Sequence, residues 1–248
     1  MAPPFGNCAY SYENNRGKPV FVPSDEGRKI GRELKRKLER RFDPPEFYFH
    51  LRDGGHVAAI HAHRAKKYFA RVDIENFFYS ISRNRVARAL RHLNMAGSER
   101  YAKWSTVKNP YGNPSYSLPY GFVQSPILAS IVLAQSPLGA LLNELAERVL
   151  VSVYMDDIAI SSNNLRNLER AFRKIRRKCK ESKFPINEAK SCAPGLEMEL
   201  FNCHLTRMQT LVTEARRQVF YSEPRSELSE AAFEAYCIAI EEGNGQQA

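Results

Sequence analysis

The sequence contains no long apolar run and no paired cysteine motif. Its hydrophobic stretches are shorter than the roughly 18 to 20 residues that a membrane-spanning helix needs, and the N-terminus lacks the apolar core of a secretory leader. The five cysteines are scattered and never form a Cys-x-x-Cys pair, which argues against a zinc knuckle and a disulfide framework. We therefore expect a cytosolic protein with no membrane partner.

Acidic residues are also scarce relative to basic ones. The chain has 37 Lys and Arg against 27 Asp and Glu, a formal net charge of +10, which suits a polyanionic partner such as nucleic acid. Its 43% hydrophobic and 26% charged residues are ordinary for a soluble globular protein. A length of 248 residues allows a large core in one compound domain or two small ones.

One pair of histidines has metal-ligand spacing. His61 and His63 form a His-x-His pair that would face one side of a strand, where two imidazoles bind metal. No cysteine lies nearby to complete a site, so we favour histidines at the surface or in contact with the backbone.

The stretch Val149 to Ser162 is the most informative part of the chain. Two apolar, β-branched runs flank Asp156 and Asp157, which predicts a β-hairpin with both carboxylates at its turn. Hairpin turns prefer Asn-Gly or Asp-Gly, and neighbouring carboxylates resist joint ionisation. A divalent cation is the usual means of holding such a pair. The alternative is that two acidic residues simply mark a solvated turn.

Two basic amphipathic helices are predicted, over Arg28 to Phe42 and Leu165 to Cys179. Apolar residues recur every three or four positions in each, and Lys and Arg fill the remaining faces. Such a face is either solvated or a contact surface for phosphates. The shorter patterns predict an extended arm (residues 1–24), a strand (Tyr68 to Ile74), a short basic helix (83–93), a polar connection (Asn94 to Tyr116), an apolar helix (Ile127 to Leu133) and a C-terminal helix (Leu228 to Ile240).

The quartet from Tyr154 to Asp157 resembles motif C of reverse transcriptases, and other blocks follow in that family's order. The blocks are Arg71 to Phe78 (motif A), Leu118 to Pro126 (motif B), Phe184 to Ser191 (motif D) and, more loosely, Glu199 to Thr206 (motif E). Motif B has Tyr120 where the family's common string has Gln, and its Gly-Phe-Val-Gln-Ser-Pro resembles bacterial defence-associated and abortive-infection enzymes. The resemblance covers roughly residues 50 to 206 and extends to retron and group II intron enzymes.

This resemblance implies an α+β fold of the right-hand polymerase type. We expect fingers and a palm, with an antiparallel palm sheet backed by helices and a minimal or absent thumb. The expected divisions are an N-terminal arm and fingers (1–67), a palm with an interleaved fingers segment (68–206) and a rudimentary thumb (207–248).

The resemblance also implies a metal site. Asp73, Asp156 and Asp157, with Ile74 beside Asp73, are expected to bind two Mg²⁺ ions, with Mn²⁺ as the alternative, about 3.5 to 4 Å apart. Successive residues of a strand point to opposite faces, so we expect Asp156 to be the essential ligand and Asp157 the supporting one. Without the resemblance, Asp73 would be assigned as a helix N-cap.

Five further residues receive roles from the same resemblance. Phe78 matches the steric gate that excludes a 2′-hydroxyl, and Lys190 matches the lysine expected as general acid; otherwise they are a core ring and a surface lysine. Arg52, Gly121 and Gln124 are expected near the template or the incoming nucleotide.

The implied activity is RNA-directed DNA polymerisation. Its expected partners are dNTPs, the DNA product, a structured non-coding RNA template used in bacterial antiviral defence, and a protein partner or oligomer that replaces the thumb. Two alternatives stay open: untemplated or protein-primed DNA synthesis, and a catalytically silent RNA-binding palm subunit.

Overall fold

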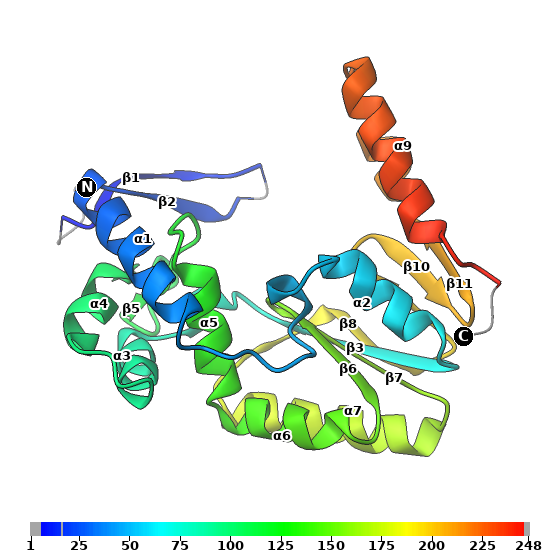
Figure 1. Cartoon of the computed structure of the whole chain (residues 1–248), viewed down its shortest axis with the longest axis horizontal. Coiled ribbons are helices and arrows are strands. Elements are labelled where there is room, and N and C mark those ends of the chain that lie inside the picture. The colour runs from blue at the N-terminus through cyan, green and yellow to red at the C-terminus, as the bar shows by residue number, and fades with distance from the viewer. Residues whose placement is uncertain (1–5, 16, 246–248) are drawn as a thin grey trace. The chain divides into compact units, whose positions relative to one another are not determined.

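The computed structural model describes residues 6–15 and 17–245, which pack as two compact units. We call them the helical unit (Met1–Pro45, Ile74–Ala140 and Cys179–Pro185) and the sheet unit (Glu46–Asp73, Leu141–Lys178 and Ile186–Ala248). Helices are combined with antiparallel sheets, as the predicted α+β class requires (Figure 1). The predicted divisions after residues 67 and 206 stay a prediction.

The sheet unit is built on a four-stranded sheet of strand order β6-β7-β3-β8. The strands are β3 (Tyr68–Ile74), β6 (Leu150–Tyr154), β7 (Asp157–Ser162) and β8 (Ile186–Gly195). β7 pairs antiparallel with both β6 and β3. This confirms the predicted strand Tyr68 to Ile74 and the hairpin around Asp156 and Asp157.

The register of β3 against β7 defines two faces of this sheet. Asp73 lies opposite Asp157, Arg71 opposite Ala159 and Phe69 opposite Ser161. Residues directly opposite each other in an antiparallel pair point to the same face, so these six form one face, which we call the carboxylate face. Helices α2 (Gly55–Arg64) and α7 (Leu165–Glu181) lie on opposite sides of the sheet (Figure 1).

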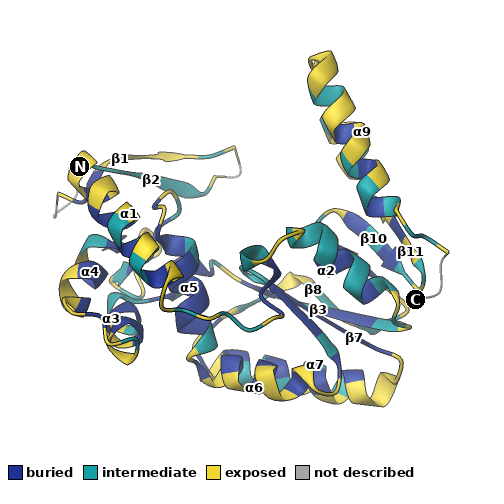
Figure 2. Cartoon of the chain, in the orientation of Figure 1, coloured by how far each residue is buried: buried dark blue, intermediate teal, exposed yellow. Residues whose placement is uncertain are grey.

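A second sheet and two helices complete the sheet unit. β9 (Glu197–Leu200), β10 (Cys203–Thr206) and β11 (Gln209–Val212) form an antiparallel sheet whose buried residues join a core with α2 and α9 (Figure 2). α9 (Glu227–Glu241) confirms the predicted C-terminal helix, while α8 (Glu214–Tyr221) was not predicted. The loose motif E is the β9–β10 hairpin.

The helical unit holds most of the remaining short elements. Phe77, Tyr79 and Leu90 are among its largest buried side chains. The elements are the 3-10 turn Phe78–Ser80, α3 (Arg83–His92), α4 (Ser98–Trp104), β4 (Val107–Lys108), β5 (Tyr116–Ser117) and α5 (Ser125–Ala134). Helix α6 (Pro137–Ala146) begins in the helical unit and continues in the sheet unit.

The extended arm with turns that was predicted over residues 1–24 is a paired β-hairpin in the part that the structure describes, and this pairing was not predicted. β1 (Cys8–Glu13) and β2 (Pro19–Pro23) form an antiparallel hairpin, and the Phe21 N–H donates to the Tyr120 carbonyl at 2.9 Å. Strands this short, rich in Tyr and bounded by Pro, carry too few alternating positions for the pattern to be recognised. Residues 1–5 and 16 lie outside the described residues.

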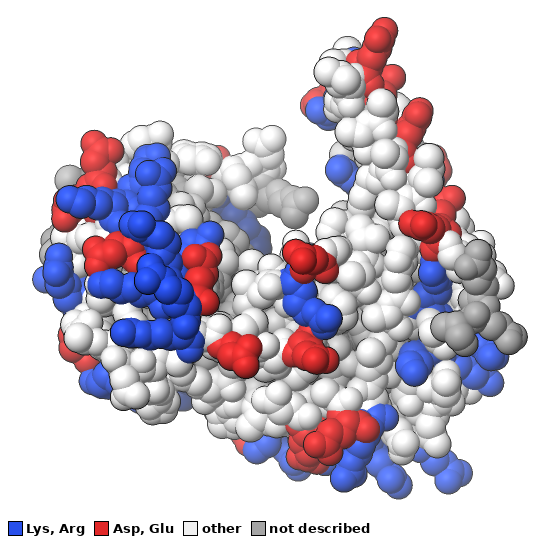
Figure 3. Space-filling model, viewed as in Figure 1, with Lys and Arg blue, Asp and Glu red and all other residues white. Residues whose placement is uncertain are grey.

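The first basic helix is confirmed, with shifted ends. α1 (Asp25–Glu39) begins three residues earlier than predicted because Ser24 caps it, accepting a hydrogen bond from the Gly27 N–H at 3.1 Å. It ends before the Asp-Pro-Pro segment. Lys and Arg gather over this helix (Figure 3), so whether its face is solvated or binds phosphate stays open.

Two other expectations need correction. The polar connection Asn94 to Tyr116 contains α4 and β4, and the segment that holds His61 and His63 forms α2 instead of a strand. The His-x-His pair therefore lies on a helix, where residues two apart point in different directions.

Among the described helices, none alone has the length and apolar character to cross a membrane, and only α5 and α6, as a bent pair, meet that test together.

Candidate active site

The carboxylate face carries Asp73 and Asp157 side by side. Asp73 is 4% exposed, and its N–H donates to Ser191 Oγ at 3.2 Å, which ties β3 to β8. The loop of the β6–β7 hairpin consists of Met155 and Asp156 only, since Tyr154 pairs with Asp157. Met155 takes the positive φ of 57° that a tight hairpin needs at this position, which leaves Asp156 in an ordinary conformation at the turn.

Arg71 joins the two carboxylates. Its Nη2 lies 2.5 Å from Asp157 Oδ1 and 3.5 Å from Asp73 Oδ2, and its Nε donates to Asp157 Oδ1 at 2.6 Å. Burial raises the pKa of Asp157 to about 6; the charges of Asp156 and Asp73 add to this rise and Arg71 opposes it. One guanidinium thus neutralises only part of the negative charge gathered here.

Arg71 was not among the predicted site residues, although its spacing from Asp73 indicates a contact. Arg71 lies two positions before Asp73 on an alternating strand, so both must point to the same face. A basic residue at that spacing predicts a direct contact with the carboxylates.

The hairpin turn is held by a histidine. His50 Nδ1 lies 3.2 Å from both the Val153 carbonyl oxygen and the Met155 nitrogen. Tyr154 packs among the rings of His50, His56 and Phe201, with centroids 5.0 to 6.2 Å apart. Phe201 itself has a positive φ of 55°, a conformation that a bulky residue adopts only when its surroundings fix it.

The donor set suits a hard divalent cation. Asp73, Asp156 and Asp157 offer only oxygen atoms, the ligands that Mg²⁺ prefers, and their charge exceeds what Arg71 supplies. In the present geometry, no group of three His, Cys, Asp or Glu among the described residues is arranged to hold a metal ion. Binding through Asp157 therefore requires Arg71 to share or release that carboxylate.

Three further predicted site residues differ in their exposure. Ile74 follows Asp73 on β3 and is fully buried. Lys190 is exposed on β8. Arg52 is exposed on a loop, donates to the Glu46 carbonyl and lies 5.3 Å from the Phe49 ring centroid. The roles predicted for these three residues stay predictions.

Phe78 belongs to the helical unit. It is 8% exposed; its ring packs edge-on against Tyr120, with centroids 4.7 Å apart, and lies tilted against Phe77, with centroids 5.8 Å apart. Phe78 is therefore a core ring, as the alternative interpretation holds. Its role as a steric gate stays a prediction.

Gly121 and Gln124 have structural partners inside the helical unit. Gly121 has φ +101°, and an added Cβ would collide with the Phe21 carbonyl oxygen of β2. Gln124 is 1% exposed and donates to Ser105 Oγ at 3.3 Å, while its amide fills the space over Gly31 of α1. These contacts explain both residues by packing, and their predicted nucleotide contacts stay a prediction.

The histidine pair is explained by structure as well. His63 is fully buried and lies 2.7 Å from both Ser161 Oγ and Ser152 Oγ, so it fastens α2 to β6 and β7. His61 Nε2 lies 3.2 Å from the Ile240 carbonyl oxygen, the backbone contact that we favoured. Both ring environments are those of structural histidines.

Comparison with known proteins agrees with this geometry. The model of the family described as "Reverse transcriptase (RNA-dependent DNA polymerase)" matches residues 14–199. No curated protein matches the chain.

Three solved structures share the fold. A foamy viral protease-reverse transcriptase in complex with double-stranded DNA aligns at TM-score 0.53 and 16% identity, covering 90% of this chain and 34% of the viral one. Telomerase from Candida albicans, with a telomeric RNA fragment, gives 0.57 and 12%, covering 79% and 43%. Apo telomerase from Candida tropicalis gives 0.54 and 13%, covering 83% and 54%. The chain thus spans a third to about half of these proteins.

Proposed function

Because the chain belongs to the reverse transcriptase (RNA-dependent DNA polymerase) family, we propose that it copies RNA into DNA by adding deoxynucleotides to a primer 3′-hydroxyl. The observation that carries this proposal is the carboxylate face, on which Asp73 and Asp157 lie opposite each other beside Asp156 at the turn. Nucleotidyl transfer needs such carboxylates because the substrate is itself a polyanion, which only an intervening cation lets them approach.

In this proposal Asp73, Asp156 and Asp157 bind two divalent cations, Mg²⁺ or Mn²⁺. When bound, these ions lower the pKa of the primer hydroxyl and neutralise charge on the triphosphate. Ser191 holds the Asp73 backbone, and His50 holds the turn that carries Asp156. These contacts orient the carboxylates before the substrate arrives, which reduces the cost of positioning during the reaction.

Two other residues have proposed roles in this reaction. Phe78 would select deoxynucleotides, since its ring is held in place by Phe77 and Tyr120 and cannot move aside for a 2′-hydroxyl. Lys190, exposed on β8, would donate a proton to the pyrophosphate leaving group.

We further propose a structured non-coding RNA as template and a place in bacterial antiviral defence. This proposal is supported by the string Gly121 to Pro126 and by Tyr120, which resemble defence-associated enzymes. Sequencing the nucleic acid that co-purifies with the protein tests it: one dominant structured RNA supports the proposal, and a random RNA population contradicts it.

Substitution of the turn carboxylate tests the activity. Asp156→Asn should lower incorporation of labelled dNTPs at least about a thousandfold, because a single essential catalytic carboxylate is worth that much or more. Asp43→Asn, at an exposed loop position, is the matched control and should be fully active. Asp157→Asn tests our proposal that Asp156 is the essential ligand and Asp157 the supporting one. The direct pairing of Asp157 with Asp73 argues for the opposite order.

The outcomes separate the alternatives. Retained incorporation by Asp156→Asn would contradict the proposed metal-dependent mechanism. A wild-type product without template sequence indicates untemplated synthesis, and a product whose size falls on protease treatment indicates protein priming. RNA binding by the wild type without incorporation, with cognate RNA and Mg²⁺ present, indicates a catalytically silent subunit.

A further inference from the structure

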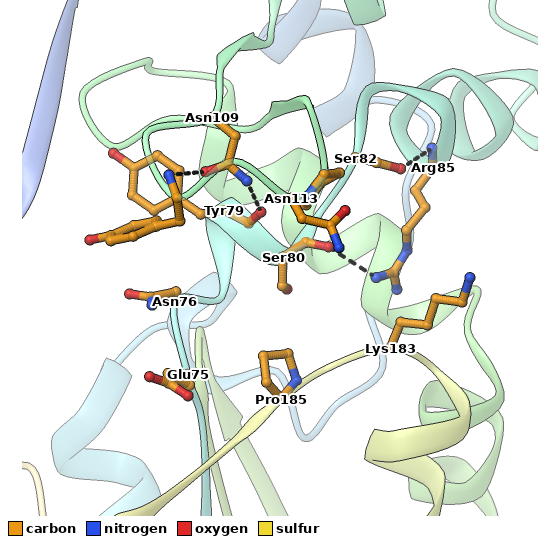
Figure 4. Close-up of a pocket in the computed structure, with 12 residues that line it drawn as sticks. Glu75, Asn76, Tyr79, Ser80, Ser82, Arg85, Asn109, Asn113, Lys183 and Pro185 are labelled. Carbon is orange, nitrogen blue, oxygen red and sulfur yellow. Dashed lines mark hydrogen bonds between the residues drawn. The ribbon is translucent and has the colours of Figure 1, made fainter.

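The helical unit contains a polar cavity that none of the predicted metal ligands lines. It has a volume of about 450 Å³, within the range of small-ligand sites. Arg85 of α3 and Lys183, in the turn after α7, lie at one end, and Tyr79 and Asn109 at the other (Figure 4). Its walls are formed by Glu75, Asn76, Tyr79, Ser80, Ser82, Arg85, Asn109, Tyr111, Asn113, Pro114, Lys183 and Pro185.

Arg85 is held in the cavity with much of its donor capacity unused. Its guanidinium lies over the Phe184 ring, 4.2 Å from the centroid, and among the described residues it donates a hydrogen bond only to the Ser80 carbonyl, at 3.5 Å. Among the described residues, no carboxylate forms an ion pair with Arg85 or Lys183. Burial and the nearby Arg88 lower the pKa of Arg85 to about 10. A half-buried guanidinium without a counter-ion is costly, and a bound anion would remove that cost.

Lys183 occupies a backbone position that favours glycine. The Phe184 N–H donates to the Cys179 carbonyl at 2.9 Å and the Lys183 N–H to the Lys180 carbonyl at 3.1 Å, which is the Schellman pattern at the end of α7. Lys183 is the left-handed residue of that pattern, with φ 56°. A lysine there weakens the helix end relative to glycine, so the backbone conformation alone does not favour it.

The opposite end of the cavity offers aromatic and amide groups. The Tyr79 and Tyr111 rings meet edge-on at 5.2 Å, and Tyr111 is 49% exposed. Asn109 fixes this wall, since its amide donates to the Tyr79 carbonyl at 3.2 Å and accepts from the Tyr111 N–H at 3.0 Å. An exposed ring held rigidly is a stacking surface for a nucleobase.

A second hollow continues from the cationic end. It has a volume of about 410 Å³, shares Ser82, Arg85 and Lys183 with the first, and adds Arg88 and His92 from the same face of α3. Glu181 and Glu75 are the acidic residues that line the two hollows. Positive charge therefore extends beyond one phosphate, along the helix.

We propose that this cavity binds one phosphorylated nucleotide unit, with its phosphate between Arg85 and Lys183 and its base against Tyr111. Arg supplies a planar fork for phosphate oxygens and Lys a mobile point charge. The nucleotide is either free in solution or one unit of a single strand whose next phosphate reaches Arg88. The proposal goes beyond DNA synthesis and does not depend on it.

Equilibrium binding to the full chain tests this site. The probes are fluorescently labelled dTMP and a labelled single-stranded RNA of about ten nucleotides, both in EDTA so that metal-dependent binding at the carboxylates does not contribute. Arg85→Gln and Lys183→Gly should each weaken binding about tenfold or more, since each removes a charge-assisted contact. Lys183→Gly should also keep or raise the melting temperature, because glycine suits its position.

Arg91→Gln is the matched control. Arg91 lies on α3 and makes a surface ion pair with Glu99 at 2.6 Å, but it lines neither hollow. It should change affinity by less than about twofold. Loss of affinity for both probes assigns a free nucleotide, and loss for RNA alone assigns a strand; both outcomes support the site.

Two results would overturn the proposal: wild-type affinity in Arg85→Gln and Lys183→Gly, or an equal loss in Arg91→Gln. The same pattern of binding in a wild type that never incorporates dNTPs would leave the cavity intact while contradicting the proposed polymerase, and unchanged binding in the Asp156→Asn protein would show that the cavity does not depend on the carboxylates. The two proposals can therefore fail independently.

Discussion

The two units use their motif residues for different purposes. In the sheet unit, Asp73 and Asp157 face each other on regular strands, and Arg71 neutralises only part of their charge. In the helical unit, Gly121 and Gln124 are already occupied by packing against β2 and α1. Equal resemblance to a motif is thus accompanied by incompletely neutralised charge in one unit and by close packing in the other, and burial with satisfied contacts is what separates the two cases.

The largest expected effect on stability comes from Gly121. Gly121→Ala should lower the free energy of unfolding by about 3 kcal/mol, because it combines a strained positive φ with a collision against the Phe21 carbonyl. Chemical denaturation of the full chain measures the loss. If Gly121 is needed for packing against β2, the free energy of unfolding of the variant must fall even when no nucleic acid is present.

Gly112→Ala is the control for this comparison. Gly112 also has a positive φ, +82°, but an added Cβ would have no atom within 4 Å. It should cost only about 1 kcal/mol, the backbone contribution by itself. Equal losses at both positions would mean that the contact with β2 does not matter, and the contrast between the units would lose its main support.

The second prediction concerns His63, which contacts Ser161 of the carboxylate face. Burial lowers the pKa of this ring to about 3 from an ordinary value of 6.5, so the unfolded chain binds the proton more tightly than the folded one. Stability from this group is complete above pH 6.5 and declines as the pH falls from 6.5 towards 3. Between pH 7 and pH 5, His63 should therefore cost about 2 kcal/mol of unfolding free energy.

Comparison with His63→Gln isolates this contribution. Glutamine keeps a donor and an acceptor for Ser152 and Ser161 but does not titrate. The stability difference between wild type and variant should shrink by about 2 kcal/mol from pH 7 to pH 5, whereas His92→Gln, at an exposed position, should follow the wild type. A pH-independent difference would show that His63 is not held neutral.

These cases also show which parts of the fold the sequence predicts. Alternation is local, so the strand Tyr68 to Ile74 and the hairpin around Asp156 were predicted, and α7 followed from strict apolar spacing. The same alternation would have identified Arg71. Strands and long amphipathic helices can therefore be predicted, because their patterns lie in consecutive residues.

The contacts that the sequence does not reveal involve partners distant in sequence. Gln124 is buried because Gly31 leaves room for its amide and Ser105 accepts its hydrogen bond, and neither neighbour is marked by the residues around Gln124. Helix α2 lacks strong periodicity, and its His63 is satisfied by serines on strands almost a hundred residues away. Tertiary contacts decided these positions, so a sequence pattern could not.

The smallest expected effect compares one residue type in both units. Tyr48, in the sheet unit, is fully buried, and its hydroxyl has no hydrogen-bond partner among the described residues. Tyr79, in the helical unit, is 2% exposed, and its hydroxyl donates to the Pro19 carbonyl at 2.6 Å. An unpaired buried hydroxyl costs stability, while a paired one contributes a net gain of similar size. Tyr48→Phe should therefore leave the free energy of unfolding unchanged or raise it by up to about 1 kcal/mol, and Tyr79→Phe should lower it by about 1 kcal/mol. Urea denaturation at one pH resolves the two signs, and a loss in Tyr48→Phe as large as that in Tyr79→Phe would show that both hydroxyls are satisfied alike.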